Sequence, residues 1–185
     1  LSWKTLTALW TANTGTKYQV NHRGQNTWDN NYTTVLTWYL MYGTSDTQTM
    51  AKDMTFDGFT LREAVVQKNI EPDGSTVVDI YYTRNEYTIT FVTGSGTVVD
   101  PITGRYEAPI TAPENPTRTW YQFAWWSPEF PTTMPLSWKT LTALWTANTG
   151  TKYYVEHYQE NIAWTWYELV EVEELSWTTD TLVKI

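Results

Sequence analysis

The chain contains no cysteine, only two histidines and few basic residues. Without cysteine it has neither a disulfide framework nor a thiolate metal site. With 12 Lys and Arg against 20 Asp and Glu, its net charge of −8 argues against nucleic acid or an anionic membrane surface as a partner. No apolar run approaches the roughly 18 residues of a membrane-spanning helix. Thr, Tyr, Val and Trp are abundant instead, and turn residues interrupt the chain regularly, which predicts a mainly β fold.

An internal repeat organises the chain. The block LSWKTLTALWTANTGTKY stands at 1–18 and returns unchanged at 136–153. Beyond the block the copies agree at Val20/Val155, His22/His157, Asn26/Asn161, Tyr32/Tyr167 and Val35/Val170. We place the loss of one residue after Val35 and before Gly43, which aligns Gly43 with Trp177. The chain therefore holds one long period and the beginning of the next.

The period is composite, and we divide it into small β modules. Residues 1–15 are expected to be the last strand of a preceding module, because the same block closes the module at 84–148. Residues 16–83 form another module, and 149–185 begin its second copy. The chain starts at Leu1 without a methionine or a signal-like stretch, so we expect export and anchoring signals to lie outside it.

Apolar alternation and turn residues predict the strands of each module. In the first module they predict a strand at 16–22, a strand rather than a helix at 60–69, and a hairpin at 69–83 that turns at Asp73-Gly74. The predicted strands of the second module are 87–91, a strand stopped by Pro101, the aromatic 119–126, and 139–148.

Residues 84–148 contain an ordered set of motifs. They are Tyr87-Thr88-Ile89-Thr90-Phe91, the Gly94/Gly96 pair, Pro113-x-x-Pro116-Thr117-Arg118, Tyr121-x-Phe123-x-x-Trp126 and Leu141-Thr142-Ala143-Leu144-Trp145. This set resembles the Listeria–Bacteroides surface repeat, also called the internalin B-repeat. Residues 16–83 resemble, more weakly, a companion repeat related to MucBP modules. The resemblance implies a tandem array of β-grasp-like modules on secreted or cell-wall-anchored bacterial proteins, which act as stalks or adhesive repeats without catalytic residues.

Large side chains occupy positions where the family commonly has glycine. These positions are Glu107, Trp120 and Trp125, and the internal repeat shows the same exchange between Gly43 and Trp177. A bulky residue at positive φ costs about 1–2 kcal/mol. The exchanges indicate an engineered sequence, an imperfectly known one, or tryptophans recruited to a surface. Five tryptophans near polar turns are candidates for contact with a glycan or a protein: Trp120, Trp125, Trp164, Trp166 and Trp177. Local packing is the alternative.

No residue set predicts catalysis, a cofactor or a metal. His22 and His157 lie one period apart, in different modules, so they are not expected to act together. The acidic run Glu168–Glu174 lacks the ligand spacing of a calcium loop. No Gly-x-Ser-x-Gly elbow is present.

We therefore expect a non-catalytic stalk, spacer or adhesin repeat of an extracellular bacterial surface protein, whose neighbours are other repeats. Two alternatives stay open. Exposed Trp and Tyr side chains would make the chain a glycan- or protein-binding module. A strand at 1–10 without partners of its own would instead complete a neighbouring subunit and build a head-to-tail filament.

Overall fold

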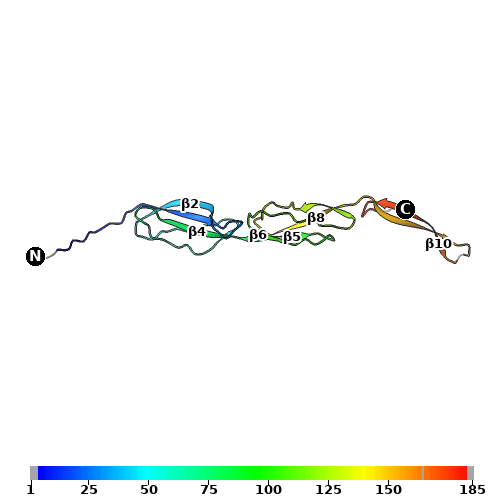
Figure 1. Cartoon of the computed structure of the whole chain (residues 1–185), viewed down its shortest axis with the longest axis horizontal. Coiled ribbons are helices and arrows are strands. Elements are labelled where there is room, and N and C mark those ends of the chain that lie inside the picture. The colour runs from blue at the N-terminus through cyan, green and yellow to red at the C-terminus, as the bar shows by residue number, and fades with distance from the viewer. Residues whose placement is uncertain (1–3, 164, 183–185) are drawn as a thin grey trace. The chain divides into compact units, whose positions relative to one another are not determined.

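The computed structural model describes residues 4–163 and 165–182, and it is built from β-strands (Figure 1). No described residue lies in a helix, so the prediction of a mainly β chain is confirmed. Contacts along the chain divide it into two compact units. The first unit comprises Leu1–Tyr87, Thr103–Ile110 and Thr133–Ser137, and the second comprises Thr88–Ile102, Thr111–Thr132 and Trp138–Ile185.

The first unit is built on a four-stranded sheet. Its strands are β1 (Thr16–Gly24), β2 (Thr34–Gly43), β3 (Phe59–Leu61) and β4 (Val77–Arg84), in the order β2-β1-β4-β3. The two central strands, β1 and β4, pair in parallel, and each edge strand pairs antiparallel with its neighbour. The first and the last strand of this sequence segment thus lie side by side at the centre of the sheet.

The core of this unit lies on one face of the sheet. Alternate residues of β4 point into it, so Val78, Ile80 and Tyr82 are buried while their neighbours are partly exposed. Tyr18 and Val20 of β1 join them. No helix covers this face. The irregular stretches before and after β3, within 44–76, cover it instead, with Ala51 and Ile70 in the core.

A second four-stranded sheet repeats this topology. Its strands are β5 (Glu86–Val92), β6 (Ile102–Arg105), β7 (Tyr121–Ser127) and β8 (Lys139–Ala147), in the order β6-β5-β8-β7. The central strands β5 and β8 pair in parallel, and β7 pairs antiparallel with β8 at the edge. Ile89, Trp126, Leu141 and Ala143 are its buried hydrophobic residues.

The last two strands, β9 (Thr151–Glu160) and β10 (Tyr167–Trp177), form an antiparallel hairpin that repeats β1–β2. Thr16 pairs with Gly43, and the equivalent Thr151 pairs with Trp177. Each hairpin has one bulged residue, Leu36 in β2 and Val170 in β10. The bulges show that these two residues are equivalent, so the residue that the second copy lacks belongs to the turn before β2. Our placement of the loss after Val35 was wrong.

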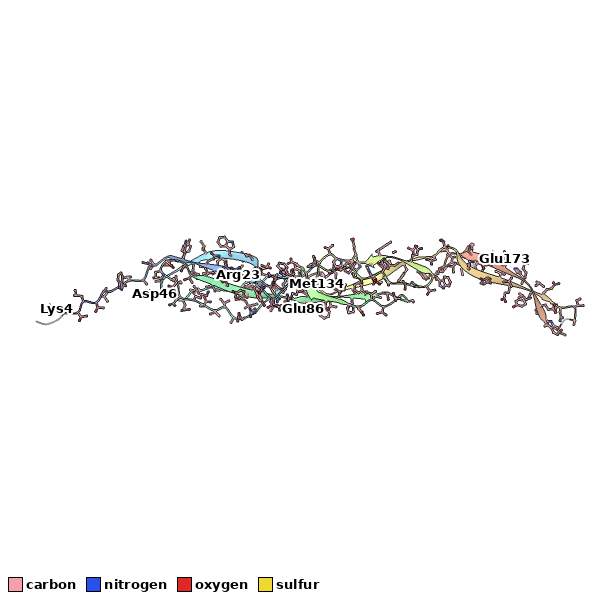
Figure 2. All side chains as sticks on the ribbon, in the orientation of Figure 1. Lys4, Arg23, Asp46, Glu86, Met134 and Glu173 are labelled. Carbon is pink, nitrogen blue, oxygen red and sulfur yellow. The ribbon has the colours of Figure 1, made fainter. Side chains whose placement is uncertain are left out.

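The repeated block adopts two different structures. Its second copy supplies β8, whereas residues 4–13 of the first copy belong to no strand. Figure 1 draws this segment as an extended trace, and Figure 2 places Lys4 on it. Leu6, Leu9 and Trp10 are more than nine-tenths exposed. The strand predicted for 1–10 is thus absent from the described residues 4–10, because the described chain offers no partner strand there.

Three further strand predictions need correction. Within 60–69 only the first two residues belong to a strand, β3. Asn69 and Ile70 do not form a hairpin with β4, because they pair with Gln48 and Thr47. The strand expected before Pro101 follows that proline instead, as β6.

Candidate functional site

The structure does not bring the candidate tryptophans together. Trp120 lies in the turn before β7, Trp125 within β7, Trp166 before β10 and Trp177 at the end of β10. All four are exposed, by 45–61%. Trp164 lies outside the described residues. The four described tryptophans therefore have different surroundings.

Two of the expected glycine positions have glycine-like backbones. Glu107 and Trp120 have φ angles of 63° and 68°, in the left-handed region that favours glycine. Trp125 is not among the residues with positive φ and belongs to strand β7. The backbone strain expected at Trp125 is therefore absent. A surface role for its side chain would carry no cost in backbone conformation.

Trp177 stands where the first unit has a closely packed glycine, Gly43. A Cβ atom built on Gly43 would lie 2.4 Å from Cδ1 of Ile70, closer than real Cβ contacts come. Trp177 at the equivalent position is 45% exposed. The Trp177 side chain is accommodated at this position because it is partly exposed.

One candidate, Trp125, lines an aromatic cleft beside edge strand β7, which we call the β7 cleft. The cleft has a volume of about 670 Å³. Its lining residues are Asn115, Phe123, Ala124, Trp125, Trp126, Ser127, Glu129 and Phe130. All of them belong to the second unit. Its size falls within the range of about 300–1,000 Å³ that is usual for small-molecule sites.

The floor of the β7 cleft is continuous with the core. Trp126 is buried, and its ring centroid lies 4.9 Å from that of Phe91 and 5.2 Å from that of Phe123. Phe130 stacks on Phe91 at 6.4 Å with nearly parallel rings. These contacts hold the aromatic floor in a fixed position.

A β-bulge turns Trp125 out of this packing. Phe123 pairs with Trp145 and Trp125 pairs with Leu144, so Ala124 is the extra residue of β7. Strict alternation would place Phe123 and Trp125 on the same face. The bulge shifts the phase, and Trp126 becomes the buried residue while Trp125 stays 61% exposed.

The polar groups on the rim of the β7 cleft have no partner among the described residues. The amide of Asn115, the carboxylate of Glu129 and the indole N–H of Trp125 form no hydrogen bond with any other described residue, and all three side chains are exposed. Sequence reasoning found Trp125 and missed Asn115 and Glu129. Both lie in irregular segments, for which periodicity gives no signal.

The first unit has an open polar groove on the other face of its sheet. Its volume is about 770 Å³, and Arg23, Arg62, Asp79 and Tyr32 are among its lining residues. Partial burial tends to raise the pKa of Asp79, but hydrogen bonds from Arg23 and Asn21 outweigh burial and lower it. Arg23 Nε lies 2.6 Å from the Asp79 carboxylate, and Arg62 stacks over Tyr32. The charged side chains of this groove therefore pair or stack with its own residues. Arg23 is labelled in Figure 2.

The two histidines occupy different environments. His22 is fully buried, and its Nδ1 lies 2.7 Å from the Tyr82 hydroxyl. His157 is 46% exposed and lies 3.7 Å from a carboxylate oxygen of Glu173. Within residues 4–163 and 165–182, no cluster of His, Asp and Glu has the arrangement of a metal site.

Among the described residues, no helix is long and apolar enough to cross a membrane. No protein-family model matches the chain, and no curated protein is similar to it.

Proposed function

We propose that the chain is a non-catalytic, tension-bearing spacer segment of an extracellular bacterial surface protein, built from tandem β-grasp-like modules. The resemblance at 84–148 supports the family and the location. The strand order shared by both sheets, with a parallel pair at the centre, supports the β-grasp likeness.

The central observation is the position of the first and last strands of each sheet. In the first sheet, Gln19–Gly24 of β1 pair in parallel with Val77–Tyr82 of β4. In the second, Ile89–Val92 of β5 pair in parallel with Lys139–Thr142 of β8. The chain enters each sheet through the first strand of this pair and leaves it through the last.

This connection determines how a sheet resists tension. A pull on the two chain ends acts on the start of the first strand and on the end of the last strand. In a parallel pair these points lie at opposite ends of the ladder, so the force runs along the strands and loads all the intervening hydrogen bonds together. In an antiparallel hairpin the force would open the bonds one after another. The geometry therefore favours resistance to pulling along the chain.

Single-molecule force spectroscopy tests the proposal. The chain, held at its two ends, is expected to unfold in two main events, from residues 16–84 and 86–147. Each event should lengthen the chain by up to about 3.3–3.6 Å for every residue released, less the span of the folded sheet. Forced unfolding reports the unfolding rate directly.

A second pulling direction provides the control. Because the chain has no cysteine, a pair of cysteines can be introduced at Lys17 and Tyr42, which face each other in the antiparallel β1–β2 ladder. Pulling on this pair should open the ladder at clearly lower force. Equal forces in the two directions would contradict a tension-bearing role.

Self-assembly is a second candidate function, favoured by the exposure of residues 4–12. This segment has the sequence of the central strand β8 and offers Leu6 and Trp10 to solvent. Pairing with a strand of another copy would satisfy the backbone hydrogen-bonding groups of this segment. Sedimentation should then show concentration-dependent association, which Leu6→Asp abolishes and Leu136→Asp does not. A chain that stays monomeric at all concentrations would exclude this candidate.

A further inference from the structure

We infer that the β7 cleft binds a neutral oligosaccharide, with Trp125 as the stacking surface. This binding activity is separate from the proposed mechanical role and does not depend on it. It follows from three properties of the cleft: an aromatic wall, unpaired polar groups on the rim, and negative charge.

The aromatic wall suits the apolar face of a sugar ring. A pyranose with equatorial hydroxyls presents axial C–H bonds on its two faces, and these carry slight positive charge. The face of an indole is electron-rich, so it attracts such C–H groups and shields them from water. Trp125 is held in a strand and remains 61% exposed, so this surface is both rigid and accessible.

The rim supplies hydrogen bonds for the sugar hydroxyls. The Glu129 carboxylate accepts hydrogen bonds, and the Asn115 amide both donates and accepts them. Neither side chain bonds to another described residue, so a ligand would displace only water from them. An aromatic wall with a few convergent polar groups is the usual composition of a small-molecule site.

Charge selects a neutral saccharide. Among the described residues, Glu129 is the only charged one that lines the β7 cleft, and the whole chain has a net charge of −8. A uronic or sialic acid would place its carboxylate beside Glu129, and none of the described lining residues is a Lys or Arg that could compensate. Uncharged hydroxyl and acetamido sugars avoid this repulsion.

An extended peptide is a weaker candidate for the same cleft. A peptide would add as a strand to the free edge of β7, through regular backbone hydrogen bonds. The bulge at Ala124 interrupts this edge, and bulges of this kind protect edge strands from pairing. The side chains of the cleft, rather than the backbone of β7, are therefore the recognition elements.

Titration of the whole chain with defined oligosaccharides tests the inference. Cellotetraose and tetra-N-acetylchitotetraose serve as neutral probes, sialyllactose as an acidic probe, and an uncharged strand-forming hexapeptide as the peptide probe. Binding is followed by calorimetry and by saturation transfer from protein to sugar protons. We expect at least one neutral probe to bind with a dissociation constant on the order of 1 mM, and tighter than the other two probes.

Variants then locate the site. Trp125→Ala and Glu129→Gln should each weaken the neutral probe, by about tenfold and about threefold respectively. Trp138→Ala removes a tryptophan that is 75% exposed in the same unit and lies outside the cleft, and should leave binding unchanged. Circular dichroism confirms that each variant remains folded. Three results would overturn the inference: preference for sialyllactose or the peptide, no binding by either neutral probe, or equal binding by folded Trp125→Ala.

Discussion

Leu141 has no exposed surface, whereas Leu6, the same residue of the repeated block, is 94% exposed. The eighteen residues around each leucine are identical, so local sequence does not explain the difference. Leu141 lies in β8 between two neighbouring strands, and Leu6 has none. Strand formation by this block therefore depends on the partners that the fold supplies.

This pair of leucines provides a matched test of burial. Leu141→Ala should destabilise the second unit by about 2–5 kcal/mol, because it removes buried methyl groups and leaves a cavity. Leu6→Ala removes the same atoms from an exposed side chain and should change stability by less than about 0.5 kcal/mol. Urea denaturation followed by tryptophan fluorescence measures both. Similar losses in the two variants would show that residues 4–12 are packed in solution.

The buried His22 should make the first unit sensitive to mild acid. Burial lowers its pKa below the ordinary value of 6.5, although the carboxylate of Asp53 acts in the opposite direction. Below pH 6.5 the unfolded chain then binds a proton that the folded chain resists, so stability falls as the pH is lowered. The loss is at most about 1.4 kcal/mol for each pH unit.

Denaturation at several pH values between about 7.5 and 5 measures this effect. His22→Phe removes the titrating group and should flatten the dependence of stability on pH. His157→Phe, at the equivalent and exposed position of β9, should leave it unchanged. A pH dependence that persists unchanged in His22→Phe would contradict this assignment to His22.

Arg84 joins three parts of the first unit. Its side chain is only 6% exposed, and it donates to the backbone oxygens of Gln25 at 2.6 Å and Tyr106 at 3.0 Å. It also pairs with the Glu107 carboxylate at 2.6 Å. Arg84→Met should destabilise the unit by about 2–4 kcal/mol, since it leaves these acceptors without a donor. Arg62→Met removes an exposed arginine stacked on Tyr32 and should lower the stability by about 1 kcal/mol or less. Thermal denaturation of both variants measures the difference.

The sequence allowed most strands of the fold to be predicted, but not their pairing. Alternation marks 87–91 and 139–148, because one face of each strand is buried. Its aromatic residues mark 119–126. The parallel pairing of β1 with β4 joins residues almost sixty positions apart, such as Val20 and Val78, and no local pattern encodes it. The strand predicted at 60–69 was mostly wrong, since this apolar segment covers the core as irregular chain.

The candidate site could likewise be predicted only in part from the sequence. Trp125 was a candidate because a large residue stands where the surface repeat that residues 84–148 resemble commonly has glycine. Asn115 and Glu129 gave no signal, since irregular segments bring them to β7 only in the folded chain. The bulge at Ala124 decides which of two adjacent tryptophans is buried, and sequence alone does not locate a bulge.

Trp120 is the position where a substitution should increase stability. Its φ of 68° is disfavoured for a residue with a side chain, and its indole is 56% exposed. Its backbone oxygen accepts the N–H of Asn148, a bond that glycine would preserve. Trp120→Gly should therefore stabilise the second unit by about 1 kcal/mol. Gln122→Gly is the matched control, because Gln122 is exposed in β7 without positive φ, and it should cost about 0.5–1 kcal/mol. A loss of stability in both variants, measured by urea denaturation, would mean that the Trp120 side chain contributes more by packing than its backbone costs.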